Sequence, residues 1–130
     1  MPSRPLSPHL TVYKFKYTMT TSILNRLSGL ILSLGLLLLV YWLLAVANGA
    51  AAQARATRLL STPGAKLLYG LLIAAFCYHL VAGLRHLVWD TGRYLERAQS
   101  QKSAWLVGWV SIILTLLVGY WAFFVGAHAP

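Results

Sequence analysis

Hydrophobic residues gather along the chain in three long runs, at residues 27–47, 67–89 and 104–126. Each run is long enough to cross a bilayer core about 30 Å thick, which takes roughly 20 helical residues. None of the runs alternates between polar and apolar residues with the period of two that a transmembrane β-barrel requires. The pattern therefore predicts an all-α membrane protein with three transmembrane helices, at about residues 22–47, 66–90 and 103–126.

Composition supports a membrane protein and limits its size. The 130 residues suit one domain, a membrane anchor over residues 1–130, and 58% of them are hydrophobic whereas 10% are charged. The alanine-rich residues 50–56 are expected to form a short interfacial helix. The single cysteine, Cys77, excludes an intrachain disulfide, and we expect it to pack as a small apolar side chain. Ala45-Val-Ala47 resembles a signal-peptide cleavage site, but the apolar run exceeds the usual length of about 7–15 residues, which favours an uncleaved anchor.

The chain is strongly basic, with a formal net charge of +9. Its sequence has no basic face interleaved with aromatic residues, so we expect the charges to meet anionic lipid headgroups rather than nucleic acid. Eight basic residues lie before the first span, at its entrance or around the end of the second span, and three lie between the first span and the start of the second: Arg4, Lys14, Lys16, Arg26, Arg85, Arg93, Arg97 and Lys102 against Arg55, Arg58 and Lys66. This bias predicts a cytoplasmic N-terminus and a periplasmic C-terminus.

The second apolar run ends in a polar face built around His79. On a helix, His79, Gly83, His86 and Asp90 fall within roughly 60° of one another, whereas Arg85 points to another side. His79 lies near the middle of the predicted span, and Gly83 one turn later leaves room for a flat ligand. This spacing is typical of a transmembrane helix that binds haem through an imidazole, with His79 as axial ligand of the iron.

The same residues also allow a purely structural role for His79, and they set a condition on haem binding. A lone histidine in a membrane helix is more often hydrogen-bonded between helices, and His79 taken alone favours that interpretation. If haem binds, Arg26, Arg85 and His86 are available to meet its propionates near the inner surface. The sequence has no second histidine near the middle of the membrane, so a six-coordinate haem needs a ligand from another chain.

A second polar face lies at the start of the first span. Its residues follow helical spacing and therefore share one side of the helix: Ser22, Asn25, Arg26, Gly29 and Ser33. Spacing alone does not distinguish a binding site from a seam of small packing residues below a snorkelling arginine. The sequence shows no carboxylate pair, phosphate-binding loop or nucleophile beside a base, so we do not expect the chain to be catalytic alone.

Two segments resemble the signatures of a known family. Arg4-Pro-Leu-Ser-Pro-His-Leu and Ser22-Ile-Leu-Asn-Arg26-Leu-Ser28 are similar to the first signature of the cytochrome b membrane anchors of succinate dehydrogenase. His79-x3-Gly-Leu-Arg-His-Leu-x-Trp-Asp90 is similar to the second. The resemblance covers almost the whole chain. It implies a subunit of complex II in a bacterial inner (cytoplasmic) membrane, where the three helices are part of a heteromeric haem-binding bundle.

The resemblance also implies an activity, partners and cofactors. Such anchors help to pass electrons from succinate oxidation to ubiquinone, in the tricarboxylic acid cycle and the respiratory chain. The implied partners are a second small membrane anchor, an iron–sulfur subunit and a flavoprotein subunit. Haem b would be shared between the two anchors, with His79 as the iron ligand from this chain. Ser22 and Arg26 match residues that help to form the ubiquinone site.

One position departs from the family pattern, and two alternatives stay open. Asn25 stands where the family usually has histidine, which would weaken a contact to a propionate but leaves His79, Ser22 and Arg26 unchanged. The first alternative is an anchor of a fumarate reductase, which runs the reaction in the opposite direction. The second is a structural membrane protein whose polar residues only pack.

Overall fold

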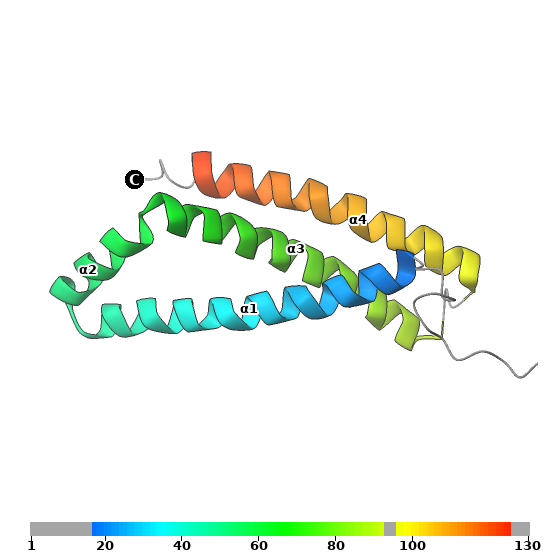
Figure 1. Ribbon diagram of the computed structural model, residues 1–130, viewed down its shortest axis with the longest axis horizontal. Coiled ribbons are helices and arrows are strands. Elements are labelled where there is room, and N and C mark those ends of the chain that lie inside the picture. Colours follow the sequence, from blue (N-terminus) through cyan, green and yellow to red (C-terminus); the bar gives the residue numbers. More distant parts are fainter. Residues whose placement is uncertain (1–16, 93–95, 126–130) are drawn as a thin grey trace, which may run out of the picture.

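The computed structural model describes residues 17–92 and 96–125, which form four α-helices and one π-helical turn. Three helices are long: α1 (Tyr17–Ala47), α3 (Pro63–Asp90) and α4 (Arg97–Tyr120), the last continuing into the π-helical turn Trp121–Val125. The short helix α2 (Ala50–Leu60) joins α1 to α3 (Figure 1). The described residues include no strand, which confirms the predicted all-α class.

Three stretches are long and apolar enough to cross a membrane: Met19–Ala47, Pro63–Asp90 and Ala98–Val125, with mean hydropathies of 2.6, 2.0 and 2.0. They correspond in order and position to the three predicted spans, but they begin three, three and five residues earlier. The reason is that residues outside the apolar runs, such as the polar residues 20–21 and 99–102, are also helical, because a helix satisfies its own backbone groups in any environment. The alanine-rich residues 50–56 lie within α2, as expected.

Local sequence sets both ends of α3. Pro63 occupies the first turn, where a missing N–H breaks no hydrogen bond, and the Thr62 hydroxyl accepts a hydrogen bond from the N–H of Ala65 at 3.4 Å. At the other end, Gly92 adopts a φ of 76°, and its N–H donates to the carbonyl of Trp89 at 2.8 Å. A glycine is suited to this left-handed conformation, so the helix ends where the sequence predicts.

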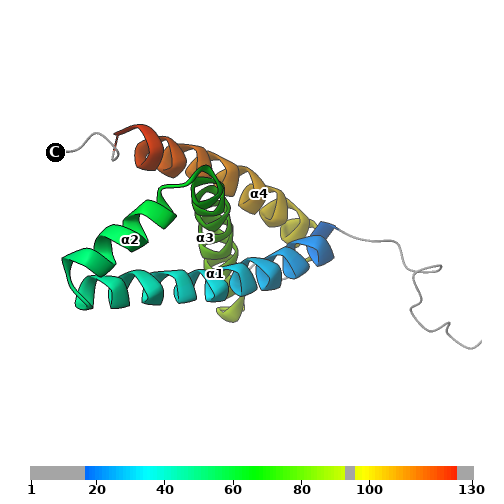
Figure 2. The same ribbon diagram turned by 60° about the vertical axis from the view of Figure 1, so that its left-hand side comes forward.

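The long helices pack antiparallel, with α3 between α1 and α4. Contacts between α1 and α3 run in opposite chain directions: Thr21 with Arg85, Gly29 with His79, and Gly35 with Leu72. Figures 1 and 2 show α1 crossing α3 and the two helices diverging toward α2. Helix α4 follows the other side of α3. The N-terminal part of α1, the C-terminal part of α3 and the start of α4 therefore meet at one end of the bundle.

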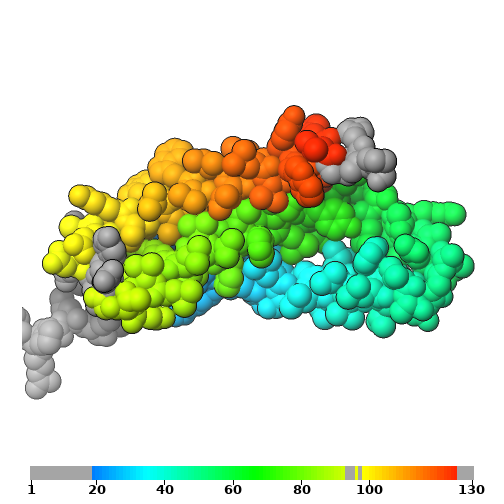
Figure 3. Space-filling model, turned by 180° about the vertical axis from the view of Figure 1, so that it is seen from behind, coloured from blue at the N-terminus to red at the C-terminus, as the bar shows by residue number. Residues whose placement is uncertain are grey.

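Small side chains fill the contacts between the helices. The buried apolar residues are Ala45, Ala56, Ala75, Cys77, Ala82, Ala104 and Val107. Most large apolar side chains face outward, as expected where lipid or another membrane subunit covers the surface. Cys77 is 2% exposed, which confirms its predicted packing role. In Figure 3 α4 lies against α3, and the surface is hollowed between α3 and α1.

Candidate functional site

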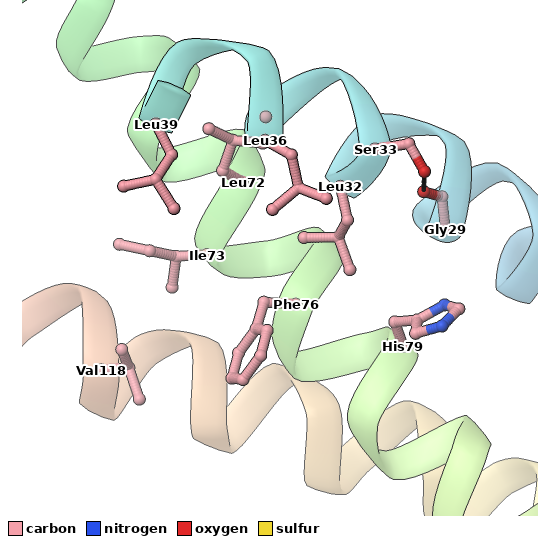
Figure 4. A pocket seen from close by; sticks show the side chains of 11 residues that line it. Gly29, Leu32, Ser33, Leu36, Leu39, Leu72, Ile73, Phe76, His79 and Val118 are labelled. Carbon is pink, nitrogen blue, oxygen red and sulfur yellow. Dashed lines mark hydrogen bonds between the residues drawn. The ribbon is translucent and has the colours of Figure 1, made fainter. Parts of the chain in front are cut away.

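An apolar pocket of about 590 Å³ lies between α1 and α3 at the level of His79. Its walls are formed by Gly29, Leu32, Ser33, Gly35, Leu36 and Leu39 of α1, by Leu72, Ile73, Phe76 and His79 of α3, and by Val118 of α4. Figure 4 shows His79 at one end, with its ring turned toward the Gly29 region of α1, while Phe76 extends toward Val118. Among the described residues that line this pocket, His79 is the one with a titratable side chain.

The His79 ring is held against α1 by two hydrogen-bond contacts and by the close approach of Gly29. Its Nδ1 lies 3.1 Å from the hydroxyl oxygen of Ser28 and 3.1 Å from the backbone carbonyl oxygen of Asn25. A Cβ placed on Gly29 would lie 3.0 Å from Cε1 of the ring. Any larger residue at position 29 would therefore press on the imidazole, so Gly29 lets α1 approach it closely. Nδ1 makes both of these contacts with oxygen atoms, and Nε2 takes part in neither.

The other members of the predicted α3 face do not converge on His79. A Cβ on Gly83 would have no atom within 4 Å among the described residues, so this turn of α3 is open. Nδ1 of His86 lies 2.7 Å from the carbonyl oxygen of Ala82, and its ring is tilted against Trp89 at a centroid distance of 5.4 Å. Asp90 is exposed.

Arg85 lies away from His79, on the side of α3 that its helical position predicts. It is 8% exposed, and its guanidinium carbon lies 3.9 Å from the centre of the Trp89 ring. Nε donates to the Ser103 hydroxyl at 2.9 Å, and Nη2 donates to the carbonyl and hydroxyl oxygens of Ser100 at 2.8 and 3.3 Å. Nη1 donates to the Thr21 hydroxyl at 3.3 Å. One guanidinium thus connects α3 to α4 and α1, and the structure does not bring it into the surroundings of His79.

Thr21 is fixed to α3 at two atoms. Besides the contact from Arg85 to its hydroxyl, its backbone carbonyl accepts a hydrogen bond from the Tyr78 hydroxyl at 3.0 Å. Thr21 is 3% exposed. Two hydrogen bonds at one residue define both the position of α1 along the bundle axis and its rotation relative to α3. They therefore also fix the directions of the neighbouring Ser22 and Arg26.

The predicted polar face of α1 is divided in the structure. Ser22 is half-buried and Arg26 is exposed, one turn apart at the start of α1. Gly29 and Ser33 line the pocket, and the Ser33 hydroxyl donates to the carbonyl of Gly29 at 2.9 Å. The side-chain oxygen of Asn25 is buried and has no hydrogen-bond partner among the described residues, whereas its backbone carbonyl contacts His79.

Sequence reasoning named Asn25 but missed that it forms a second polar stripe on α1 with Thr21 and Ser28. Thr21, Asn25 and Ser28 stand at positions i, i+4 and i+7, which places them on one helix face, and all three contact α3. That spacing was a usable signal. Tyr78 carried no comparable signal, because its role depends on which residue of α1 lies opposite it.

These features define a class of protein: a three-span membrane protein in which one imidazole, held from a neighbouring helix, stands beside an apolar pocket. Residues 1–118 match the family model of the succinate dehydrogenase/fumarate reductase transmembrane subunits. The chain belongs to this family.

Individual proteins similar to this chain are cytochrome subunits of succinate dehydrogenases, in agreement with the family resemblance of its two sequence segments. The chain is 40% identical over 116 residues to the succinate dehydrogenase cytochrome b556 subunit of Paracoccus denitrificans, with 88% of each chain covered. It is 37% identical over 117 residues to the subunit of the same name from Rickettsia typhi, covering 88% of this chain and 90% of that one. It is 38% identical over 121 residues to the cytochrome b560 subunit of Reclinomonas americana, covering 88% and 81%.

Proposed function

We propose that this chain is the haem-bearing membrane anchor of a succinate:quinone oxidoreductase, complex II. It would hold haem b together with a second small membrane anchor and dock an iron–sulfur subunit and a flavoprotein subunit. It would also form part of the site where ubiquinone is reduced. The similar proteins are cytochrome subunits of succinate dehydrogenases, which supports this direction over fumarate reduction.

The observation that carries the haem assignment is the position of His79. Its Nδ1 is hydrogen-bonded to Ser28 and to the Asn25 carbonyl of α1, and the ring lies at the end of an apolar pocket in the membrane-spanning part of the bundle. Among the described residues, no three histidine, cysteine, aspartate or glutamate side chains gather to bind a bare metal ion. A single imidazole suits an axial ligand of haem, whose porphyrin supplies the remaining equatorial ligands.

The described residues fit this cofactor in three respects. Gly29 admits the ring where a Cβ would press on it, the pocket is lined almost entirely by apolar side chains, and the Gly83 turn is open. The second axial ligand would come from the other anchor. Arg26 and His86 remain candidates for the propionates, whereas the contacts of Arg85 favour a supporting role in joining the helices. Bound haem would supply one-electron transfer within the membrane.

The quinone assignment rests on Ser22 and Arg26. A quinone oxygen gains negative charge as it is reduced, so it needs donors near the boundary between lipid and water. Ser22 supplies a hydroxyl, and Arg26 supplies a permanent positive charge one turn later. Arg26 is exposed at the surface of this chain, where a partner subunit or a quinone can reach it.

A ratio of two activities tests the proposed function. In Arg26→Leu membranes, succinate:ubiquinone activity should fall about ten- to a hundredfold, because a hydrogen bond from a charged group is worth about 1.5–3 kcal/mol. Succinate oxidation by an artificial dye that accepts electrons before the membrane should stay unchanged. Ser22→Ala should cost less, since water partly replaces a hydroxyl.

Arg55→Leu provides the matched control, because Arg55 is an exposed arginine on α2, beyond the far end of α1. Its ratio of quinone to dye activity should equal that of the wild type. A wild-type ratio in Arg26→Leu as well would mean that Arg26 is a topology or packing residue and that the quinone site lies elsewhere.

We also propose a bacterial inner-membrane location with the N-terminus in the cytoplasm, from the distribution of basic residues. The end of the bundle where Ser22, Arg26 and His86 lie would then face the cytoplasm. Reporter fusions after Pro130, which lies outside the described residues, and within α2 should both report the periplasm. Cytoplasmic reporter activity from either fusion would contradict this orientation.

A further inference from the structure

Three atoms form a closed triangle at the contact between His79 and α1. Nδ1 of His79 is 3.1 Å from the Ser28 hydroxyl oxygen and 3.1 Å from the Asn25 carbonyl oxygen. The Ser28 hydroxyl also donates to the same carbonyl at 2.8 Å, the shortest of the three distances. Because Ser28 is 5% exposed, water has little access to its side chain.

The triangle determines which nitrogen of the ring carries the proton. A carbonyl oxygen only accepts hydrogen bonds, so its contact with Nδ1 requires an N–H at that nitrogen. The single Ser28 hydrogen is used toward the carbonyl, which leaves the Ser28 oxygen to accept from the same N–H. With the proton on Nε2 instead, the Nδ1 lone pair would face the carbonyl lone pairs at 3.1 Å. In its neutral form the ring is therefore protonated at Nδ1, and its free lone pair is on Nε2.

We infer that Ser28 and the backbone carbonyl of Asn25 together form a two-oxygen acceptor that orients His79 and strengthens Nε2 as an electron donor to a bound metal. This inference rests on the proposed role of His79 as the axial ligand of haem. Ser28 is a positioning residue in this scheme, because it acts through the imidazole. Partners of this kind on the second nitrogen fix the tautomer and raise the basicity of metal-binding histidines.

Electrostatics gives the direction of the effect. Two oxygens that draw the Nδ1 proton toward themselves leave more electron density on the ring. A more electron-rich imidazole stabilises ferric iron relative to ferrous iron, so the pair lowers the reduction potential of the haem. The hydrogen bond from Ser28 to the carbonyl polarises the Ser28 oxygen and makes it a better acceptor.

The neighbouring backbone prevents the ring from escaping this arrangement. With Gly29 so close to Cε1, α1 lies against the edge of the imidazole as well as against its Nδ1. The acceptor at position 25 is a backbone carbonyl, so it does not depend on the Asn25 side chain. Ser28 is therefore the acceptor that a mutation can remove.

The test uses the purified complex containing all four subunits, with Ser28→Ala, Ser28→Thr and, as control, Thr115→Val. Thr115 carries a hydroxyl that bonds to a carbonyl of its own helix at 2.7 Å, as Ser28 does, but it lies on α4 away from His79. The measurements are haem content, the midpoint potential from a redox titration of the α-band, and the low-temperature EPR spectrum of the ferric haem. The EPR spectrum reports the orientation of the axial imidazole.

Ser28→Ala should retain haem, shift the midpoint potential upward and shift the low-spin EPR signal, while Ser28→Thr and Thr115→Val stay near wild type. If Ser28→Ala loses haem but Ser28→Thr keeps it, the hydroxyl is required to hold the ligand, which also supports the inference. Full haem content in Ser28→Ala with wild-type potential and EPR signal would overturn it. Equal haem loss in Ser28→Ala and Ser28→Thr, or a downward shift, would overturn it too. A wild-type complex without haem would instead refute the proposed function.

Discussion

Replacing His79 with alanine should abolish the reduced haem α-band of the purified complex. The change removes the proposed axial ligand and the contacts of the ring with Ser28 and Asn25. With nothing to bind the iron on this side, the remaining ligand from the other anchor would leave a five-coordinate haem or none. The measurement is a dithionite-reduced minus oxidised absorption spectrum, normalised to the flavin content of the same sample.

His86→Ala is the matched control, since it removes a histidine from the same helix about 10 Å further along its axis. The Nδ1 contact of His86 is to the Ala82 carbonyl of its own helix, and its ring lies beside Trp89. As a candidate for a propionate contact it would touch the edge of the haem and not the iron, so its loss should leave the α-band in place. If His79→Ala kept the wild-type band, another residue would bind the iron, and His86 would be the next candidate. A wild-type complex without any such band would favour the structural membrane protein considered from the sequence.

Replacing Arg85 with leucine should destabilise the complex by about 3 kcal/mol. The substitution removes four hydrogen bonds, to Thr21, Ser100 and Ser103, and the stacking of a cation on Trp89. Hydrogen bonds between membrane helices average about 0.6 kcal/mol and reach about 1.7 kcal/mol, and a buried cation–π contact adds a comparable amount. The variant complex should therefore dissociate at a lower temperature, measured by size-exclusion chromatography of heated detergent samples.

Two further variants separate the geometry of Arg85 from its charge. Lys66→Leu removes the same charge at an exposed position of α3 and should melt as the wild type does. Arg85→Lys keeps the charge but lacks the planar group with donors on three sides, so we expect an intermediate loss. Equal melting of Arg85→Leu and the wild type would show that the bundle holds together without this connection between α1, α3 and α4.

The sequence was sufficient for the architecture because hydropathy reports on each helix separately. It predicted the number and order of the spans, the short α2 helix, the end of α3 at residue 90 and the different direction of Arg85. The starts of the spans were predicted late, since polar residues such as those at 99–102 lie outside an apolar run but inside a helix. Hydropathy measures where lipid is preferred, and hydrogen bonds determine where a helix begins.

Only part of the candidate site could be predicted from the sequence. Periodicity on α3 identified His79, but it grouped His79 with His86, whose ring lies beside Trp89 instead. The contacts that hold the His79 ring come from Ser28 and Asn25, more than 50 positions earlier in the chain. Such pairings depend on the vertical offset and rotation of α1 against α3. A shift of one residue changes both by about 1.5 Å and 100°, and no single-helix pattern encodes that offset.

The small residues between the helices have a consequence for how such chains diverge. Ala75, Ala82 and Ala104 are at most 6% exposed, and a larger side chain at any of them would push α3 away from its neighbours. At the outward positions one aliphatic residue replaces another with little effect, because lipid does not distinguish leucine from isoleucine or valine. Sequences that share 40% of their residues can therefore keep one fold. The positions that do not tolerate substitution are those that require a small side chain, and hydropathy does not report side-chain volume.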